Sequence, residues 1–408
     1  MRNNLTIICF IFLSLLINKS YSQSSAELYN KGLALEKDAK YTDAIASFTK
    51  VIENSPYYYE AFTERGYCSF LLGNNADAIK DLNNAIAKSK DYHLAFYYRG
   101  VVYLDQGDYL NAGNDFNKTI ALKPNYVDAY VKRAEMNIKT KNHDAAINDY
   151  TKVISMRAND ASLYLKRAKA YNKIKKRQEA AKDYSKAIEL KPDYAEAYYE
   201  RGIYYFSFGK PETSIADFTK AIALNYNPKE SYAKRADAYY QTKKYNEAIT
   251  DYTKLIDEFK MTASDIHVKR GKCYLAVNNT EAAMKDFSKV INTDRDNEEA
   301  LIMRANIYVK QNKTQQAIID FKKAIITNPN NGSAYIGRAR MYINQKKYDA
   351  ALDDLNEAIK IKPDGEAYFL RGGIKSVKND TSGACKDLKA AANLGYEEAI
   401  AKVDEFCK

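Results

Sequence analysis

Small and apolar residues recur in a fixed pattern along most of the chain, from Ser25 to Glu398. The pattern repeats about every 34 residues and contains two stretches in which apolar positions recur every three or four residues. That periodicity is typical of amphipathic helices, so each segment predicts two helices joined by a turn near its position 15. Counted so that a basic residue stands at position 7, the eleven segments begin at residues 25, 59, 93, 127, 161, 195, 229, 264, 298, 332 and 365.

Small residues at two positions of every segment predict where its two helices touch. Position 8 is always Gly or Ala, and position 20 is Ala in every segment except one, where it is Ser214. A short turn brings these positions opposite one another, and only small side chains let the two backbones approach there. Large apolar residues such as Phe116 fill position 24, and aromatic residues such as Tyr164 and Tyr171 recur at positions 4 and 11. We therefore expect much of the tyrosine to lie in the core.

Prolines mark the ends of the predicted helices, because proline lacks a backbone N–H and interrupts a helix interior. Five of the seven prolines stand at position 32 of a segment: Pro56, Pro124, Pro192, Pro329 and Pro363. The other two, Pro211 and Pro228, also fall at predicted helix boundaries. The positions of the prolines therefore agree with two uninterrupted helices in each segment.

These small, aromatic and proline positions resemble the tetratricopeptide repeat family over nearly all of residues 23–398. The chain departs from that family in having mostly Tyr or Phe instead of the early Trp, and Arg instead of Leu at position 7. The resemblance implies an all-α fold, a right-handed superhelical solenoid of about eleven helix-turn-helix units.

The last residues, 399–408, predict a helix that caps the final repeat. Ala399, Ile400, Val403 and Phe406 fall on one predicted helical face. A repeat array without such a cap would end in exposed apolar surface, so we expect this face to cover the last segment.

The basic residue at position 7 is Arg in every segment except the first, which has Lys31. Evenly spaced guanidinium groups are a candidate track for phosphate or carboxylate ligands. A structural interpretation competes with it, because position 23 is Asp in the same ten segments and is Ser47 only in the first. This joint presence and absence predicts that each Arg binds the Asp of its own hairpin through a bidentate, partly buried pair.

Variable positions of the first helices are expected to line the concave side of the solenoid, where a scaffold of the family would bind its ligand. The candidate peptide-binding residues there are Tyr67, Phe70, Tyr97, Val101, Lys132, Lys166, Lys169, Tyr199, Ile203 and Phe206. Aromatic patches beside a basic stretch suit an extended peptide with acidic and apolar side chains. Ordinary packing between repeats, with solvated lysines, explains the same residues equally well. The resemblance favours a non-catalytic scaffold that binds a protein or peptide.

Basic residues concentrate in the fifth segment, residues 161–194, which carries ten cations against four carboxylates. Together with the fourth segment it offers an alternative function, binding of an anionic polymer or of a cell-envelope surface. A solvated face is the competing interpretation. The formal net charge of the whole chain, +11, is modest for 408 residues, and we expect no nucleic-acid partner.

Residues 1–22 predict a signal peptide. They contain Arg2, an apolar run over Leu5–Leu16, and a small residue, Ser22, ahead of Gln23. The run is short for a membrane span, so we expect an exported protein, periplasmic or secreted, that is not integral to a membrane.

Motifs for catalysis, cofactors or metals do not stand out. The three histidines, His93, His143 and His267, fall in different segments and lack a ligand partner at useful spacing. Gly-rich phosphate loops, nucleophile elbows and zinc-protease motifs are absent from the sequence. We therefore expect no enzymatic activity and no cofactor.

The cysteines outside the predicted leader fall into two kinds. Cys68 and Cys273 both stand at position 10, six segments apart, and are interpreted as small buried apolar residues. Cys385 and Cys407 lie on either side of a predicted turn at Gly395-Tyr396, between the last repeat helix and the cap. We predict a disulfide between them in an oxidising compartment, with free packed thiols as the alternative.

Overall fold

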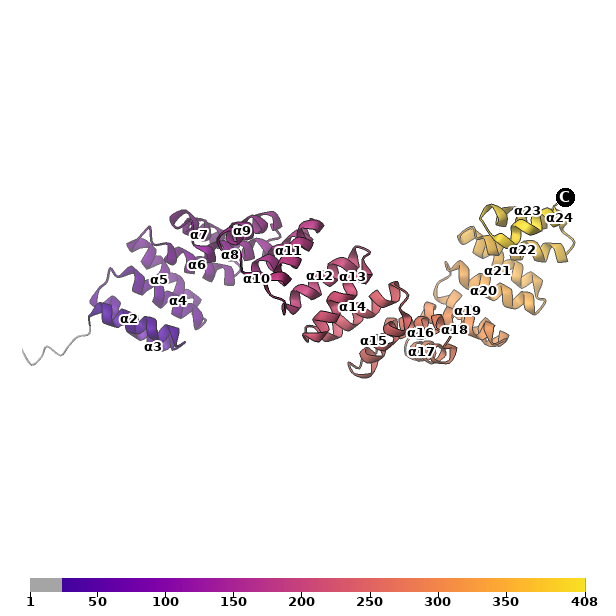
Figure 1. Cartoon of the computed structure of the whole chain (residues 1–408), viewed down its shortest axis with the longest axis horizontal. Helices are drawn as coiled ribbons and strands as arrows, with labels where there is room; N and C mark the ends of the chain where they lie inside the picture. Colours follow the sequence, from indigo (N-terminus) through magenta and orange to yellow (C-terminus); the bar gives the residue numbers. More distant parts are fainter. Residues whose placement is uncertain (1–23, 408) are drawn as a thin grey trace, which may run out of the picture. The chain divides into compact units, whose positions relative to one another are not determined.

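The structure, a computed structural model, describes residues 24–407, which form 23 helices and no strand (Figure 1). The helices are α2 (Ser25–Lys37), α3 (Tyr41–Asn54), α4 (Tyr59–Leu71), α5 (Asn75–Lys88), α6 (His93–Asp105), α7 (Tyr109–Leu122), α8 (Val127–Lys139), α9 (His143–Met156), α10 (Ala161–Lys173), α11 (Arg177–Leu190), α12 (Ala195–Ser207), α13 (Pro211–Ala223), α14 (Pro228–Gln241), α15 (Tyr245–Asp257), α16 (Ser264–Ala276), α17 (Thr280–Thr293), α18 (Glu298–Lys310), α19 (Thr314–Thr327), α20 (Gly332–Asn344), α21 (Tyr348–Ile361), α22 (Gly365–Val377), α23 (Thr381–Asn393) and α24 (Glu397–Phe406). The predicted all-helical fold is confirmed.

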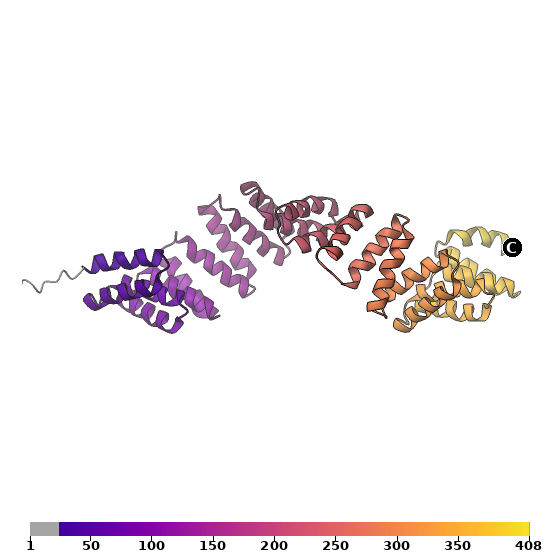
Figure 2. The ribbon, with the colours of Figure 1, turned by 90° about the horizontal axis from the view of Figure 1, so that it is seen from below.

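The helices form two compact units, one ending at Ala197 and the other beginning at Tyr198. In the first unit, α2 to α11 make five hairpins, and each helix packs against the next one along the chain (Figures 1 and 2). The helices from α13 to α24 of the second unit follow the same rule. First helices of successive hairpins also contact one another, as α2, α4, α6 and α8 do in the first unit. Stacking of similar hairpins in chain order is the solenoid arrangement expected from the repeats.

The turn inside each hairpin places one residue, at position 15, in the left-handed region of backbone conformation. Gly73, Gly107 and Gly209 occupy it with φ of 82°, 78° and 66°. In the other eight hairpins the residue carries a Cβ and has φ between 56° and 63°: Ala39, Lys141, Lys175, Lys243, Asn278, Asn312, Lys346 and Asn379. Since this conformation costs a residue with a Cβ about 1 kcal/mol, packing of the two helices must stabilise these turns.

Aromatic and leucine side chains at position 24 form the centre of each hairpin. Phe116 has no exposed surface, and neither have Leu82 and Tyr184. A Cβ placed on Gly100, at position 8, would lie only 2.9 Å from Cε1 of Phe116. At Gly66 the added Cβ would lie 3.1 Å from both the Ala78 carbonyl oxygen and Cγ of Leu82. Small residues at position 8 therefore accommodate the large side chain at position 24 as well as the backbone at position 20.

The last helix, α24, packs against α23, but the predicted apolar face is only partly correct. Ala399 is fully buried, whereas 51% of Ile400 is exposed. Neighbouring residues on a helix point about 100° apart, so the face that buries Ala399 turns Ile400 toward solvent. The expectation that Ile400 covers the last repeat is wrong.

No helix among residues 24–407 is both long enough and apolar enough to span a bilayer. The predicted signal peptide, residues 1–22, lies outside the described residues.

Candidate functional site

The position 7 arginines form bidentate pairs with the position 23 aspartates of their own hairpins. In the third repeat, Nε and one terminal nitrogen of Arg99 each donate to a different oxygen of Asp115, both at 2.8 Å. The same pairing occurs in all ten repeats that carry Arg and Asp. Hydrogen bonding to Asp115 raises the pKa of Arg99 above its ordinary value, although burial opposes the charge. We call these ten arginine–aspartate pairs the arginine ladder. The structural interpretation is confirmed, because the aspartates occupy the guanidinium groups that phosphate or carboxylate ligands would need.

Most of the position 7 arginines also donate a third hydrogen bond, to a residue of the preceding repeat. The remaining terminal nitrogen of Arg167 donates to the hydroxyl of Thr151, at 3.0 Å, which stands at position 25 of the repeat before. Equivalent bonds run from Arg65, Arg99, Arg133, Arg235, Arg270, Arg304 and Arg371 to Thr, Asn or Ser. Each of these arginines thus links the two helices of its own hairpin and also links that hairpin to the preceding one. Small polar residues at position 25 were a signal for this bond that the sequence analysis did not use.

Aromatic residues at positions 4 and 11 lie against the guanidinium groups of the ladder. The guanidinium carbon of Arg167 lies 5.7 Å from the ring centre of Tyr164 and 5.8 Å from that of Tyr171. Both rings are only partly buried. The assignment of these rings to the core is correct in part, because Tyr164 packs against the buried cluster that contains Tyr150, and Tyr130, also at position 4, is itself buried. The tyrosines with almost no exposed surface stand at position 24.

A hollow of about 350 Å³ lies on the surface formed by the first helices α4, α6 and α8. We call this surface the first-helix face. The hollow is lined by Tyr67, Phe70, Tyr97, Val101, Leu104, Asp105, Lys132, Glu135 and Lys139. Five of the residues predicted to bind a peptide, those from Tyr67 to Lys132, therefore meet in one place. Aromatic and aliphatic walls with a charged rim are what a peptide-binding hollow requires.

The lysines predicted for a basic stretch are paired with carboxylates on the same face. Glu135 accepts from Lys132 at 3.1 Å and from Lys166 at 2.8 Å. Lys169 pairs with Glu196. Glu135 is held in its charged form, since the two lysines outweigh burial and lower its pKa. These three lysines offer much less free positive charge than the sequence suggests.

The predicted aromatic patch of the sixth repeat belongs to α12, in the second unit. Tyr199 packs with its ring centre 6.1 Å from that of Phe218 and 5.7 Å from that of Tyr226. Ile203 and Phe206 are partly buried. Tyr199 therefore packs within its own repeat, and its role in peptide binding stays a prediction.

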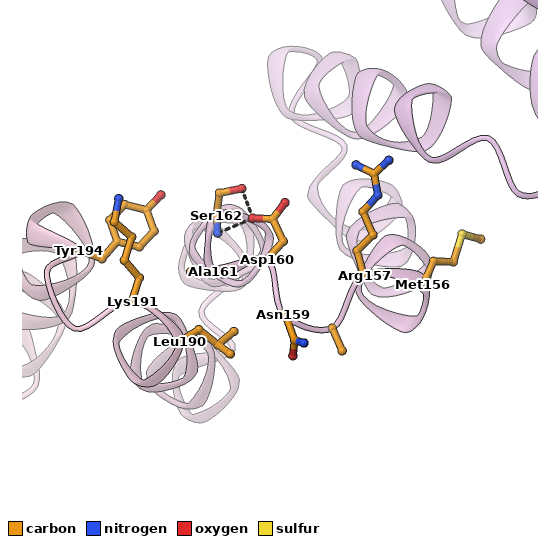
Figure 3. Close-up of a pocket in the computed structure, with 10 residues that line it drawn as sticks. Met156, Arg157, Asn159, Asp160, Ala161, Ser162, Leu190, Lys191 and Tyr194 are labelled. Carbon is orange, nitrogen blue, oxygen red and sulfur yellow. Dashed lines mark hydrogen bonds between the residues drawn. The ribbon is translucent and has the colours of Figure 1, made fainter.

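A second hollow, of about 750 Å³, was not predicted and lies among the loops between α9 and α10 and between α11 and α12 (Figure 3). Asp160 stands in it between Arg157 on one side and Lys191 with Tyr194 on the other. One oxygen of Asp160 accepts from the backbone N–H of Ser162 at 2.9 Å and from its hydroxyl at 2.6 Å. These bonds cap the start of α10, so the carboxylate in the hollow already has a structural role.

A buried carboxylate without a partner lies at the edge of the first-helix face, and the sequence analysis missed it. Glu64, on α4, is only 6% exposed and has no hydrogen bond or ion pair with any described residue. Burial, followed by the charge of Glu36, raises its pKa to about 8. A glutamate at a variable position gives no sequence signal of burial, because burial here depends on rings from three repeats.

No group of three potential metal ligands converges among residues 24–407. Nδ1 of the buried His267 lies 3.2 Å from Asp286, a ladder aspartate. Cys68 and Cys273 are buried free thiols. The structure joins Cys385 to Cys407 by a disulfide, with their Cα atoms 5.4 Å apart.

Several solved structures resemble this fold. They include a tetratricopeptide repeat protein from Parabacteroides merdae, 19% identical, with a TM-score of 0.41 over 61% of this chain and 98% of the other. MamA from Desulfovibrio magneticus RS-1 is 21% identical, with a TM-score of 0.39 over 41% of this chain and 94% of the other. Yeast Tom70 is 16% identical, with a TM-score of 0.40 over 93% of this chain and 95% of the other. Curated proteins give no match.

Family models extend over both compact units. Models described as tetratricopeptide repeat match residues 29–162 and 302–366 in overlapping stretches, and residues 195–258 and 264–297. A further model described as TPR repeat matches residues 175–209. The matches cover well over half of the 408 residues and follow the hairpins seen in the structure. The chain therefore belongs to the tetratricopeptide repeat family.

Proposed function

We propose that the protein is a non-catalytic scaffold that binds an extended peptide segment of another protein in the hollow of the first-helix face. Tetratricopeptide repeat proteins are in general protein-interaction scaffolds without catalytic chemistry. The observation that carries the proposal is the meeting of Tyr67, Phe70, Tyr97 and Val101 in a single hollow. Buried aromatic anchors surrounded by a polar rim supply most of the affinity in peptide interfaces.

An extended peptide fits this surface better than a compact small molecule. Phe70 and Leu104 stand at the same position of successive repeats, and Tyr67 and Val101 do so one turn earlier. Anchors that recur from one repeat to the next suit a chain whose side chains also recur at intervals.

The alternative, an anionic polymer on repeats four and five, gains no support from the paired lysines Lys132, Lys166 and Lys169. A salt titration separates the two functions. Polyanion binding should weaken steeply between low and high ionic strength, whereas binding through aromatic anchors should change little.

The experiment is a selection from a displayed library of unstructured peptides on the chain from residue 23 onward, followed by fluorescence anisotropy of the selected peptides. We expect Tyr97→Ala to weaken binding by about tenfold or more, as loss of an aromatic anchor does. Val101→Arg, which fills the hollow while leaving the aromatic walls in place, should weaken it similarly. Tyr109→Ala is the matched control, because Tyr109 is 37% exposed on a second helix, α7. Selected peptides that bind all three variants equally would contradict the proposal.

We further propose that the chain works outside the cytoplasm, in a periplasm or after secretion. The pattern of residues 1–22 and the proximity of Cys385 and Cys407 support this location. Intact-mass measurement of the native protein, with alkylation before and after reduction, tests it. We expect a chain starting near Gln23 in which Cys385 and Cys407 react only after reduction. A full-length chain with both thiols free would contradict it.

A further inference from the structure

Glu64 lies where the first helices of three successive repeats meet. It belongs to α4, which contacts α2 on one side and α6 on the other. Glu36 on α2 is close enough for its charge to act on Glu64. On the other side, the charge of Glu64 acts on Tyr98 of α6. The carboxyl group is thus held between repeats one and three, on the same face as the hollow.

Four tyrosines stand near this carboxyl group. Tyr67 and Tyr98 stack in parallel, with ring centres 4.1 Å apart and an angle of 12° between the planes. Tyr67 also lines the hollow, so the stacked pair adjoins it. Tyr29 and Tyr92 are close enough for the charge of Glu64 to act on them, since burial and then that charge raise the pKa of each. All four rings are partly exposed, so this group of rings is open to solvent.

Among the described residues, the groups whose charge interacts with Glu64 include no cation. On α2 they are Tyr29 and Glu36, on α4 Tyr67 and Cys68, on α6 Tyr98, and in the connecting segments Tyr92 and Tyr126. The neighbouring cation in sequence, Arg65, is committed to Asp81 through two bonds of 2.7 and 2.8 Å. Elsewhere the fold pairs its buried side-chain carboxylates with arginine, so an unpaired one at a solvent-reachable face needs another explanation.

We propose that Glu64, with Glu36 beside it, is the counter-ion for a cationic side chain of the bound peptide, a lysine or an arginine, which lies against the stacked rings of Tyr67 and Tyr98. This inference rests on the proposed peptide-binding function and names the chemistry that the peptide brings.

A cation satisfies each feature of the site. An ammonium or guanidinium group supplies the donors and the positive charge that Glu64 lacks, and aromatic faces attract cations. A carboxylate ligand would find no positive charge there among the described residues, and an aliphatic side chain would leave the buried carboxyl group without a partner. Glu36 is only partly buried, so the cation reaches Glu64 from that side without crossing the core.

The test uses Nα-acetyl-lysine methylamide as the cationic probe and Nα-acetyl-norleucine methylamide as the matched probe without the ammonium group. Both are titrated into the chain from residue 23 onward, labelled with ¹³C at the glutamate carboxyl carbons. We expect the lysine probe to bind at least about tenfold more tightly than the norleucine probe, as an added charge-assisted bond in a partly buried site allows. The resonance that disappears in Glu64→Gln should be the one that the lysine probe shifts.

Two variants identify the group responsible. Glu64→Gln keeps the shape of the side chain and should abolish the preference for lysine over norleucine. Glu53→Gln makes the same change on an exposed residue of α3 and should leave the preference intact. A thermal melt of each variant checks that it is folded. Equal binding of the two probes to the parent chain, or a preference that survives Glu64→Gln, would overturn the inference.

Failure of the cation site is distinguishable from failure of the peptide-binding function. If selected peptides depend on Val101 but the probes show no lysine preference, the cation site is wrong and the peptide function stands. If the lysine probe shifts the Glu64 resonance but no peptide depends on Val101, the cation site stands and the location of peptide binding is wrong.

Discussion

Asp115 and Glu64 are carboxylates of the first unit, buried to the same degree, with exposures of 4% and 6%. Asp115 lies inside a hairpin, where Arg99 donates two bonds to it. Glu64 lies on the first-helix face, where no hydrogen bond or ion pair from a described residue reaches it. Burial raises the pKa of both carboxyl groups, but in Asp115 the hydrogen bonds from Arg99 oppose the rise. The comparison teaches that two carboxyl groups buried to the same degree differ in the donors that their surroundings supply.

The same contrast recurs at the end of the second unit. Burial favours the neutral form of Asp387, but bonds from Arg371 and Lys375 lower its pKa below the ordinary value. Glu64 experiences burial without such bonds, and its pKa rises to about 8. The aspartates inside the repeats therefore have cationic donors, whereas Glu64 on the face of the first repeats has none among the described residues.

The largest expected effect comes from breaking a pair of the ladder. Arg99→Ala leaves Asp115 buried and unpaired, in the situation of Glu64, and should lower the free energy of unfolding by about 3 to 5 kcal/mol. Urea denaturation followed by circular dichroism measures it. Arg99→Leu combined with Asp115→Leu, which removes both charges, should recover most of the loss.

The first repeat supplies the control for this experiment. Lys31 stands at the position of Arg99 but has Ser47 in place of the aspartate, and its side chain is exposed. Lys31→Ala should change stability by less than about 0.5 kcal/mol. Similar losses in Arg99→Ala and Lys31→Ala would show that the ladder does not stabilise the hairpins through its pairs.

The next largest effect should come from removing the charge of Glu64, with a size that depends on pH. Its pKa is raised from 4.5 in the unfolded chain to about 8 in the folded one, so the folded state keeps a proton that the unfolded state loses. Stability of the parent chain therefore falls as pH rises from about 4.5 to about 8. Glu64→Gln cannot ionise and escapes this loss, so it should be more stable than the parent at pH 9 by a few kcal/mol.

Thermal unfolding of the parent and of Glu64→Gln across this pH range measures the difference. Below pH 4.5 the two proteins should melt at nearly the same temperature, because Glu64 is then protonated in both states. A difference that does not change with pH would mean that Glu64 is not buried in its neutral form.

The smallest effect concerns the third bond of the arginines. Thr151→Val removes the hydroxyl that accepts from Arg167 and should cost about 1 kcal/mol, the usual net contribution of a hydrogen bond. In the repeat before Arg338, position 25 is Lys322, and no such bond forms among the described residues. Lys322→Thr should therefore stabilise the chain by up to about 1 kcal/mol. Chemical denaturation checks both, and a loss in Lys322→Thr would contradict the linking role of position 25.

Much of the fold could be predicted because each hairpin has the same small, large apolar and charged residues at the same positions. The periodic small residues and the joint variation of Arg and Asp at positions 7 and 23 carry the information about pairing inside a hairpin. The left-handed turn at Lys141 or Lys243 could not be predicted in this way, because lysine has no local preference for that conformation. Contacts between the two helices hold it there.

The candidate site was predictable only in part. Tyr67, Phe70, Tyr97 and Val101 occupy positions that vary between repeats, and such positions indicate a ligand face without indicating which residues meet. The pairing of Lys166 with Glu135 joins residues 31 positions apart in sequence, and it reversed the expectation of a free basic stretch.

The sequence by itself determined the helical hairpins, their number and their internal charge pairs, because those depend on residues at fixed spacing within one repeat. Only the tertiary structure decided which side chains of different repeats share a surface. Glu64 shows this, because it is buried at a surface that several repeats share. It lacks a donor because the neighbouring cation, Arg65, is bonded to Asp81. The burial of a surface side chain and the pairing of its charge depend on residues of several repeats, so the sequence of one repeat does not reveal them.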